Sequence, residues 1–339
     1  MNKVLCFGEL LLRFSPNINA DWLTKNSMPV YIGGSEFNVA AALSKWNIPV
    51  KYCTALPKNY LSENILNNLK RRGIDTSSII FSGNKIGLYY LQEGTDLKHA
   101  NVVYDRAYSS FSELKPEIIN WNDALKDVCW LHFSAISAAI NEQTAEVCKE
   151  AVNAAREKNI TISVDLNYRS KLWQYKKYPF EIMTELISNC DVVMGNIWSA
   201  NKLLKISLDE EIDRNKNKSS YIDHAYKTAK EIQQKFPACK TIANTFRFDR
   251  EKNGIEYYAT LFSNEKQFVS KKFSCDKIVG KVGSGDCFMA ALIYGMINKH
   301  PPQQIVDFAA AAAFGKLQEK SDATNQSIEQ INLILKNYE

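Results

Sequence analysis

Strand-like and helical patterns alternate from the start of the chain. Apolar strand-like runs cover Lys3 to Phe14 and Val50 to Leu56, and runs with helical spacing cover Glu36 to Trp46 and Leu61 to Arg72. Gly73 follows the second helical run at the position where glycine commonly ends a helix. Strands that alternate with helices form a mostly parallel sheet covered on both faces, so the pattern predicts an α/β fold.

The same alternation returns after a break and continues to the C-terminal part. The predicted strands there are Val128 to Phe133, Thr161 to Leu166, Asp191 to Met194 and Cys239 to Thr245. The predicted helices are Glu142 to Lys158, Pro179 to Ser188, Ile197 to Leu204 and Ile222 to Lys235. The polar segment Leu208 to Ser220 is interpreted as a surface insertion. Ligands bind at the carboxyl ends of the strands in such sheets, so the site is expected at that edge.

The break itself is rich in strand-like runs without helices between them. These runs are Ser78 to Phe81, Gly87 to Gln92 and Asn101 to Tyr104. They do not fit a parallel sheet with crossover helices, and they predict a small additional sheet that acts as a lid. No internal repeat and no linker divides the chain, so residues 1–339 are expected to form a single domain.

Composition excludes several classes of function. The 339 residues are 45% hydrophobic and 23% charged, which is ordinary for a globular protein. The net charge of +5 is modest and the basic residues are scattered, so nucleic-acid binding is not expected. No apolar run reaches the roughly 18 residues of a membrane span, and the N-terminus lacks a signal-peptide pattern. Together with eight cysteines that form no CxxC pair, this favours reduced thiols and a cytoplasmic location.

A glycine-rich stretch from Gly280 to Phe288 is the strongest candidate site. Gly283-Ser284-Gly285 precedes an apolar helical run, and Asp286 falls in the first turn of that helix. A helix N-terminus that follows such a turn offers free N–H groups and a favourable dipole to an anion. A carboxylate beside a phosphate site can take a proton from an attacking hydroxyl. The alternative is an ordinary glycine turn that an aspartate caps.

Three further stretches carry residues suited to ligand binding. Gly33-Gly34-Ser35 forms a second glycine turn before a helix, and Asp165 to Arg169 follows a predicted core strand. Tyr104 and Arg106 alternate onto one face of a strand in the additional sheet. Taken alone, these patterns also fit a simple turn, a surface arginine and a half-exposed sheet. The four histidines are far apart and show no metal-ligand spacing, so no protein metal site is expected.

These residues resemble the ribokinase (PfkB-type) family of sugar kinases, and within it the branch that phosphorylates 2-keto-3-deoxygluconate. The resemblance runs almost from end to end. Its marks are Gly8-Glu9 with Arg13, Gly33-Gly34 with Asn38, Arg72-Gly73-Ile74-Asp75, Tyr104-Asp105-Arg106, Asp165-Leu166-Asn167-Tyr168-Arg169, Gly195-Asn196 and Gly283 to Asp286. It implies a ribokinase-like three-layer α/β/α fold with a mostly parallel central sheet. It also implies a discontinuous β lid from roughly residues 10–34 and 83–113, which in this family often makes a dimer contact.

The resemblance assigns roles residue by residue. Asp286 matches the catalytic base, and Gly283, Ser284 and Gly285 match the anion hole for the transferred phosphate. The positions that match the sugar-acid site are Gly34, Asn38, Tyr90, Tyr104, Arg106, Arg169 and Asp322. The positions that match the nucleotide side are Asn167, Asn196 and Thr245. The implied cofactors are ATP and Mg²⁺ carried mainly by the nucleotide, and the resemblance leaves the use of a monovalent cation open.

Two departures from the family pattern concern the metal. Gly280-Lys281 stands where the family has an acidic residue before the glycines, and Ser199 stands where it usually has a glutamate. Neither removes the base or the anion hole. The expected function is ATP-dependent phosphorylation of 2-keto-3-deoxygluconate on its terminal hydroxyl. The alternatives are a fructokinase or other ketose kinase and a sugar-acid-binding relative without catalysis. Arg106 and Arg169 would lack a counter-charge beside a neutral sugar, which favours the acid.

Overall fold

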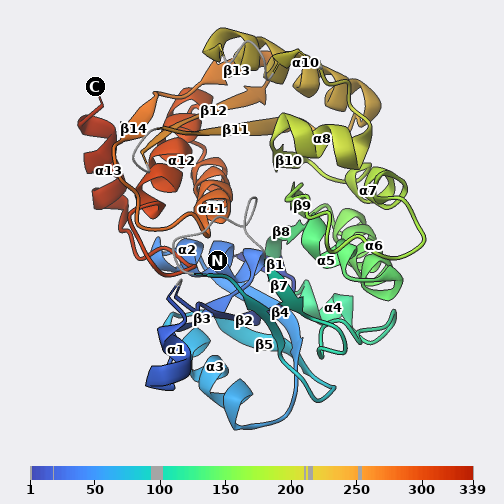
Figure 1. The fold of residues 1–339 in the computed structure, drawn as a ribbon. Coiled ribbons are helices and arrows are strands. Elements are labelled where there is room, and N and C mark those ends of the chain that lie inside the picture. Colours follow the sequence, from blue (N-terminus) through green and yellow to red (C-terminus); the bar gives the residue numbers. More distant parts are fainter. Residues whose placement is uncertain are drawn as a thin grey trace.

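A large sheet of ten strands runs through the middle of the molecule (Figure 1). The computed structural model describes residues 2–17, 19–92, 102–209, 211–212, 217–250 and 254–338. The order across the sheet is β13-β12-β11-β10-β9-β8-β1-β4-β5, and β14 pairs with β12. The parallel strands are β1 (Lys3–Phe7), β4 (Val50–Leu56), β5 (Asp75–Phe81), β8 (Val128–Ser134), β9 (Thr161–Asp165), β10 (Val192–Gly195) and β11 (Thr241–Asp249). The antiparallel edge consists of β12 (Ile255–Ser263), β13 (Lys266–Val269) and β14 (Phe273–Cys275).

The central strands are apolar along their whole length because helices cover both of their faces. Every residue of β4 is buried, and in β1 the run from Val4 to Phe7 is fully inaccessible to solvent. This continuous burial is typical of parallel strands between two helical layers. The expected three-layer α/β/α fold with a mostly parallel sheet is confirmed.

One helical layer packs against the sheet around the C-terminal helices. Its members share the core that contains Phe37, Leu292 and Ile331. They are α2 (Ser35–Lys45), α3 (Tyr60–Arg71), α11 (Ser284–Ile297), α12 (Pro302–Lys316) and α13 (Ile328–Lys336). The run Ala309 to Ala313 is fully buried in α12, where its small side chains let α12 approach α11 closely.

The other layer covers the opposite face with the helices from the middle of the chain. Its members are α4 (Trp121–Ala124), α5 (Ala135–Ala139), α6 (Glu142–Glu157), α7 (Pro179–Ile187), α8 (Ile197–Leu204) and α10 (Lys218–Lys235). Figure 1 shows α5 to α8 on the right of the sheet and α11 to α13 on its left. The short helices α4 and α5 were not predicted, since each is too short to show helical periodicity.

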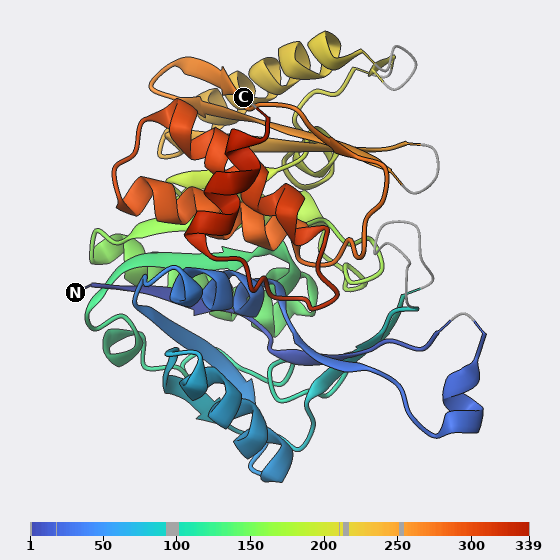
Figure 2. The same cartoon turned by 90° about the vertical axis from the view of Figure 1, so that its left-hand side faces the viewer.

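A separate four-stranded sheet, called the small sheet below, stands beside the carboxyl ends of the central strands (Figure 2). Its order is β3-β2-β6-β7, and its strands are β2 (Leu11–Phe14), β3 (Val30–Gly33), β6 (Gly87–Tyr90) and β7 (Val103–Asp105). All four fall within the two segments expected to form a lid. The short helix α1 (Asp21–Lys25) connects β2 to β3 and buries none of its residues.

The single strand predicted from Lys3 to Phe14 is wrong. The chain divides there into β1 of the central sheet and β2 of the small sheet. The division falls at Gly8 to Leu10, where the buried carboxylate of Glu9 turns toward Arg106 and Ser109 rather than continuing an apolar strand face.

The predicted surface insertion from Leu208 to Ser220 is only partly described. Ile212 is buried against Tyr221, and α10 already begins at Lys218 with Asn217 as its N-cap. Residues 210 and 213–216 lie outside the described residues.

The cysteine side chains and the hydrophobicity of the helices can be compared with what the composition indicated. All eight cysteines are free thiols, and six of them are buried. No helix in the described ranges is both long and apolar enough to cross a membrane.

Helix α13 offers a matched test of the core. Ile331 is fully buried on its inner face, whereas Leu333 is 58% exposed on the same helix. We expect Ile331→Ala to lower the free energy of unfolding by about 2–5 kcal/mol, because it leaves a cavity against α12. Leu333→Ala should change it by only about 0.5 kcal/mol. Urea denaturation of both variants measures the difference, and equal losses would contradict the packing described.

Candidate active site

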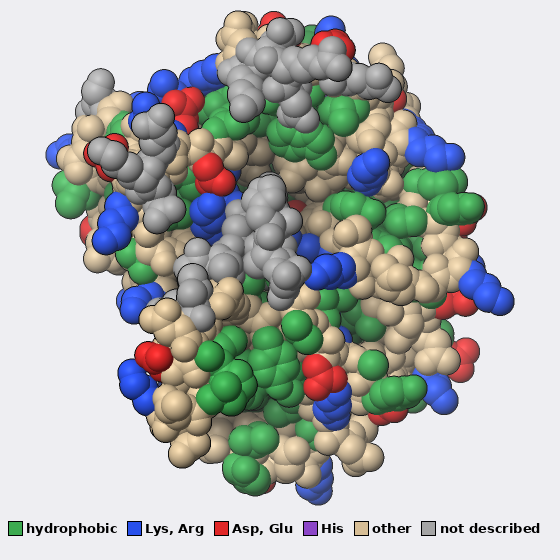
Figure 3. All heavy atoms as spheres, in the orientation of Figure 1, with side chains coloured by type: hydrophobic (Ala, Val, Ile, Leu, Met, Phe, Trp, Pro, Cys, Tyr) green, Lys and Arg blue, Asp and Glu red, His purple; other side chains and the backbone are tan. Residues whose placement is uncertain are grey.

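A cavity lies where the carboxyl ends of the central strands meet the small sheet and the N-terminus of α11. Its lining comes from both sheets and from the loops between them. Figure 3 looks onto this face, which is hollowed near its middle, with Lys and Arg side chains in blue near the hollow. The position agrees with the expectation that the site lies at this edge of a parallel sheet.

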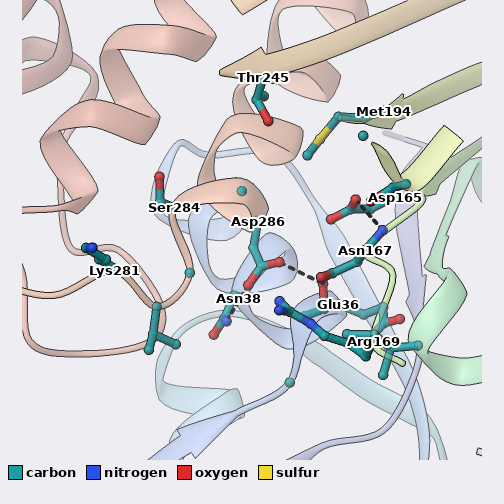
Figure 4. Close-up of a pocket in the computed structure, with 18 of the residues that line it drawn as sticks. Glu36, Asn38, Asp165, Asn167, Arg169, Met194, Thr245, Lys281, Ser284 and Asp286 are labelled. Carbon is teal, nitrogen blue, oxygen red and sulfur yellow. Dashed lines mark hydrogen bonds between the residues drawn. The ribbon is translucent and has the colours of Figure 1, made fainter. Parts of the chain in front are cut away.

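Asp286 occupies the centre of the cavity. It lies in the first turn of α11 and is only 7% exposed. Its carboxylate accepts a hydrogen bond from the Ser35 hydroxyl and another from the Asn38 side-chain amide, each at 2.7 Å. Figure 4 shows Asp286 pointing toward Asn38, with Asn167 and Arg169 opposite. Two residues of α2 therefore orient the carboxylate of α11.

The environment of Asp286 favours its neutral form more than water does. Burial raises the pKa of Asp286 above its ordinary value, and the hydrogen bonds from Asn38 and Ser35 oppose that rise. A carboxylate whose pKa is raised in this way accepts a proton more readily than one in water.

The turn before α11 requires glycine. Gly283 is the N-cap residue, with a φ of 78° in the left-handed region. A Cβ on Gly283 would lie 2.0 Å from the carbonyl oxygen of Asp322, so no other residue fits. The Ser284 hydroxyl donates to the Ala313 carbonyl at 3.0 Å. The backbone N–H groups of the first turn have no acceptor within the helix and remain suited to an anion.

One end of the cavity holds most of the predicted sugar-site residues. Gly34, Asn38, Tyr104, Arg106 and Arg169 all line it. They come from the N-terminus of α2, from the small sheet and the residue that follows it, and from the loop after β9. The structure therefore brings together residues that are up to 135 positions apart, from Gly34 to Arg169.

Arg106 already has a counter-charge, which the sequence analysis did not foresee. Its Nε donates to the buried carboxylate of Glu9 at 2.5 Å, and Glu9 also accepts from Ser109. Only 7% of the Arg106 side chain and 1% of the Glu9 side chain are exposed. The expectation that Arg106 would be unpaired beside a neutral sugar is wrong.

Tyr90 and Asp322 do not line the cavity. On β6 the alternation of side chains places Tyr89 toward the cavity, while Tyr90 packs against Phe14 on the other face. Asp322 lies behind the lining, where it accepts from Arg13 at 2.8 Å and from the Tyr89 hydroxyl at 3.0 Å. Asp322 therefore positions Tyr89, and Tyr89 takes the place expected for Tyr90.

The other end of the cavity holds the residues predicted for the nucleotide. Asn167, Asn196 and Thr245 line it, at or near the carboxyl ends of three neighbouring strands. Asn196 also caps α8 by accepting from the Ser199 backbone N–H at 2.8 Å. Two basic residues that sequence reasoning missed, Arg247 and Lys281, line the same end.

Two buried carboxyl groups beside Asp286, those of Glu36 and Asp165, were given no role of their own in the sequence analysis, although Asp165 opens one of the stretches named there. Glu36 accepts from the Ser134 backbone, from the Ser134 hydroxyl at 2.6 Å and from Ser137. Burial raises the pKa of Glu36 to about 7, and these hydrogen bonds oppose the rise. Burial and then the charge of Asp286 raise the pKa of Asp165 to about 7. Their sequence positions could have indicated this placement, because Glu36 follows the Gly33-Gly34 turn and Asp165 ends a central strand. Both positions belong to the edge of the sheet where the site was expected.

The comparisons with known proteins identify the class of protein that this fold and site define. Residues 1–329 match the model of the pfkB family of carbohydrate kinases. The chain belongs to this family, and it is a phosphotransferase that acts on a carbohydrate.

Individual relatives match along nearly the whole chain. The structure of 2-dehydro-3-deoxygluconokinase from Thermotoga maritima is 34% identical with a TM-score of 0.90, covering 99% of this chain and 100% of that one. The 2-dehydro-3-deoxygalactonokinase of Haloferax volcanii is 24% identical over 337 residues, which are 98% of this chain and 96% of that protein. A fructokinase from Xylella fastidiosa, solved with bound ATP, shares the fold at 15% identity and a TM-score of 0.74, covering 99% of each chain.

The raised pKa of Asp165 predicts a pH-dependent stability. The folded protein binds a proton at Asp165 between about pH 4 and pH 7, where the unfolded chain has lost it. This contribution to the stability of the folded state is therefore lost as the pH rises through that window. Asp165→Asn should gain more stability relative to the parent at pH 8 than at pH 5, as measured by chemical denaturation.

The control for this comparison is Asp276→Asn, which changes an exposed carboxylate. The difference between this control and the parent should be similar at the two pH values. A gain from Asp165→Asn that shrinks as the pH rises would contradict the assignment of a raised pKa.

Proposed function

We propose that the protein phosphorylates 2-keto-3-deoxygluconate with ATP on its terminal hydroxyl and forms 2-keto-3-deoxy-6-phosphogluconate. One observation carries the proposal. A buried carboxylate, Asp286, is oriented by Ser35 and Asn38 directly beside a glycine turn suited to an anion. Two relatives that match nearly the whole chain, one of them at 34% identity, are named as 2-dehydro-3-deoxygluconokinase and 2-dehydro-3-deoxygalactonokinase, which supports this class of substrate.

Asp286 acts as the general base in this proposal. The two hydrogen bonds from α2 fix the carboxylate, so an unshared electron pair on an oxygen can face the sugar hydroxyl. The hydroxyl proton passes to Asp286 as the hydroxyl oxygen attacks the terminal phosphorus of ATP, and the bond from that phosphorus to the bridging oxygen breaks and releases ADP. A positioned base of this kind contributes about 10²- to 10⁴-fold to the rate.

The turn from Gly283 to Gly285 acts as the anion hole. Its backbone N–H groups and the N-terminal end of α11 face the place where negative charge grows on the transferred phosphate. Lys316 and Asp322 pack behind the turn, so the turn is held in one conformation before the substrate arrives. Such donors stabilise the charge without having to reorganise during the reaction.

The nucleotide end fits a triphosphate by its charge. Arg247 and Lys281 line this end, and Asn167, Asn196 and Thr245 add polar groups. In the part of the chain that the structure describes, no three His, Cys, Asp or Glu side chains gather as they would around a metal. We therefore assign Mg²⁺ to the phosphates and water, a mode common for this ion.

The sugar acid is assigned to the end with Tyr104, Arg106 and Arg169. Arg106 uses Nε for Glu9, and the terminal nitrogens of its guanidinium remain for the substrate carboxylate. Charge-assisted bonds from guanidinium groups to a carboxylate are among the stronger protein contacts. Gly34, Asn38 and Tyr89 complete the lining at this end.

A ketose kinase such as a fructokinase is the second candidate, and one observation favours it. Glu9 neutralises Arg106, so a neutral sugar would not leave this guanidinium without a partner. A non-catalytic sugar-acid binder is the third reading, since Ser199 and Gly280 stand where the resemblance implies acidic residues. The oriented carboxylate of Asp286 argues against this third reading.

We also propose that the protein is cytoplasmic and forms a homo-oligomer through the small sheet. The face of this sheet that is turned away from the cavity is apolar and partly exposed, formed by Leu12, Phe14, Val30, Ile32, Leu88, Tyr90 and Val103. Figure 3 shows hydrophobic side chains gathered over the lower half of this view, where β2 and β7 lie in Figure 1. An exposed apolar sheet face of this kind is typical of a protein interface.

Asp286→Asn is the direct test of the base. The amide keeps the size of the side chain but cannot accept the proton, so kcat should fall about 10²- to 10⁴-fold. Calorimetry should show that the variant still binds ATP and the sugar acid. Turnover within a few-fold of the parent, measured by coupled ADP release, would remove Asp286 from this role.

Arg106→Ala tests whether the substrate is an acid. The loss of a charge-assisted bond should lower kcat/KM for 2-keto-3-deoxygluconate about 10- to 100-fold. Any activity on fructose should fall far less. The variant also leaves Glu9 without its partner, which can lower the fraction of folded protein. Such a loss lowers kcat/KM for both sugars by the same factor, so the ratio of the two values is the decisive measurement.

Two further variants complete this comparison. Arg169→Ala should lower kcat/KM for the acid at least as much, because Arg169 lies between the two ends of the cavity. Arg71→Ala, on the exposed side of α3, is the matched control and should leave the ratio unchanged. An unchanged ratio in Arg106→Ala, or a parent that prefers fructose, would favour the ketose kinase.

A further inference from the structure

A fully buried lysine lies directly behind the anion-hole turn. Lys316 is the last residue of α12, and its relative exposure is 0%. A Cβ on Gly283 would lie 3.4 Å from Cε of Lys316, so the end of this side chain packs against the turn. Lys316 does not line the cavity, and the reaction described above does not use it.

The ammonium of Lys316 is poorly paired for a buried charge. It has three donors, and its hydrogen bond in the described structure is a long one, 3.5 Å, to the carbonyl oxygen of Glu319. Within the described ranges no carboxylate oxygen lies within ion-pair distance of it. Burying a charge without a close partner costs stability, so a lysine here is unexpected for packing alone.

Negative groups surround this ammonium at longer range. The carboxylates of Glu319, Asp322 and Asp286 all act on Lys316 through space. Burial lowers the pKa of Lys316, and these groups oppose the change. Asp322 is also paired with Arg13, whereas Glu319 keeps one carboxylate oxygen without a hydrogen-bond donor in the described residues.

The segment that carries Lys316 also supports the turn mechanically. The backbone N–H groups of Val279 and Gly280 donate to the Leu317 carbonyl at 2.8 and 3.1 Å. A Cβ on Gly280 would lie 2.9 Å from the Glu319 carbonyl oxygen. The residues that begin the anion-hole turn are therefore held against residues 317–319, next to the residue that carries the ammonium.

We propose that Lys316 is a positioning residue that provides a fixed positive charge behind the anion hole. Its ammonium stabilises the turn from Gly280 to Gly285 in the form that binds the phosphate, and it balances the carboxylates gathered there. Because this charge belongs to the chain, the site needs no monovalent metal ion in that place. The kinetic part of the inference rests on the proposed function.

Lys316→Met is the variant that tests this role, because methionine has a similar length and carries no charge. In a buffer with tetramethylammonium as the cation, kcat should fall about 10- to 100-fold, the effect expected of one charge several ångströms from the phosphate. Adding K⁺ or NH₄⁺ at constant ionic strength should restore part of this loss. The parent should be equally active with tetramethylammonium, Na⁺ or K⁺.

The melting temperature separates this role from a structural one. Replacing a buried, poorly paired charge by an apolar side chain is often neutral or stabilising, so Lys316→Met should melt at or above the parent temperature. Lys336→Met, at an exposed position of α13, is the matched control and should resemble the parent in every measurement.

Several outcomes would overturn the inference. These are a parent that K⁺ activates several-fold, a Lys316→Met variant with parental turnover, and a variant that melts lower and that K⁺ does not rescue. If Lys316→Met does not fold, the cation dependence of the parent still tests the inference: activity that is independent of K⁺ supports it, and activation by K⁺ contradicts it. If the parent phosphorylates no sugar, the proposed function fails, and ADP binding then tests Lys316: its affinity should be lower in Lys316→Met and recover with K⁺.

Discussion

The hydrogen bonds from α2 to Asp286 are the contacts on which the site depends. Ser35 and Asn38 lie about 250 positions before Asp286 in the sequence, and both reach its carboxylate at 2.7 Å. The contact is possible because α2 and α11 pack side by side on one face of the central sheet. Each helix begins after a glycine with positive φ, Gly34 or Gly283, so each first turn faces the cavity. The fold therefore positions the Asp286 carboxylate, the proposed base, by joining two helix N-termini.

The electrostatics of the cavity follow from this arrangement. Asp286, Asp165 and Glu36 are buried close together, and desolvation raises the pKa of each. Cations such as Arg106 and Lys281 line the same cavity. Buried acids with raised pKa values therefore lie beside cations that can attract anionic ligands.

The sequence predicted the fold class from local patterns, and most of the site residues that it indicated, with the help of the family resemblance, do line the cavity. Continuous apolar strands imply burial on both faces, and a glycine turn before a helix implies an anion site. Side-chain direction and long-range pairing were not predictable in the same way. Tyr90 was predicted for the sugar site, but Tyr89 is the residue that lines the cavity. Neighbouring residues of a strand point to opposite faces of the sheet, so a shift of one position changes the face on which the side chain lies. Glu9 could not be matched to Arg106 because about 100 residues separate the two, and only the packing of the small sheet brings them together.

The pairing of Glu9 with Arg106 connects the proposed substrate-binding guanidinium to the position of the small sheet. Glu9 lies between β1 of the central sheet and β2 of the small sheet, and Arg106 directly follows β7. Their bond, together with that of Asp322 to Arg13 on β2, ties the small sheet to the central part of the molecule at two places. A substrate that draws the guanidinium of Arg106 toward itself must compete with Glu9 for the same charge. If Arg106 binds a carboxylate as proposed, the strength of this ion pair therefore affects both how firmly the small sheet is held and how much of the Arg106 charge the substrate can use.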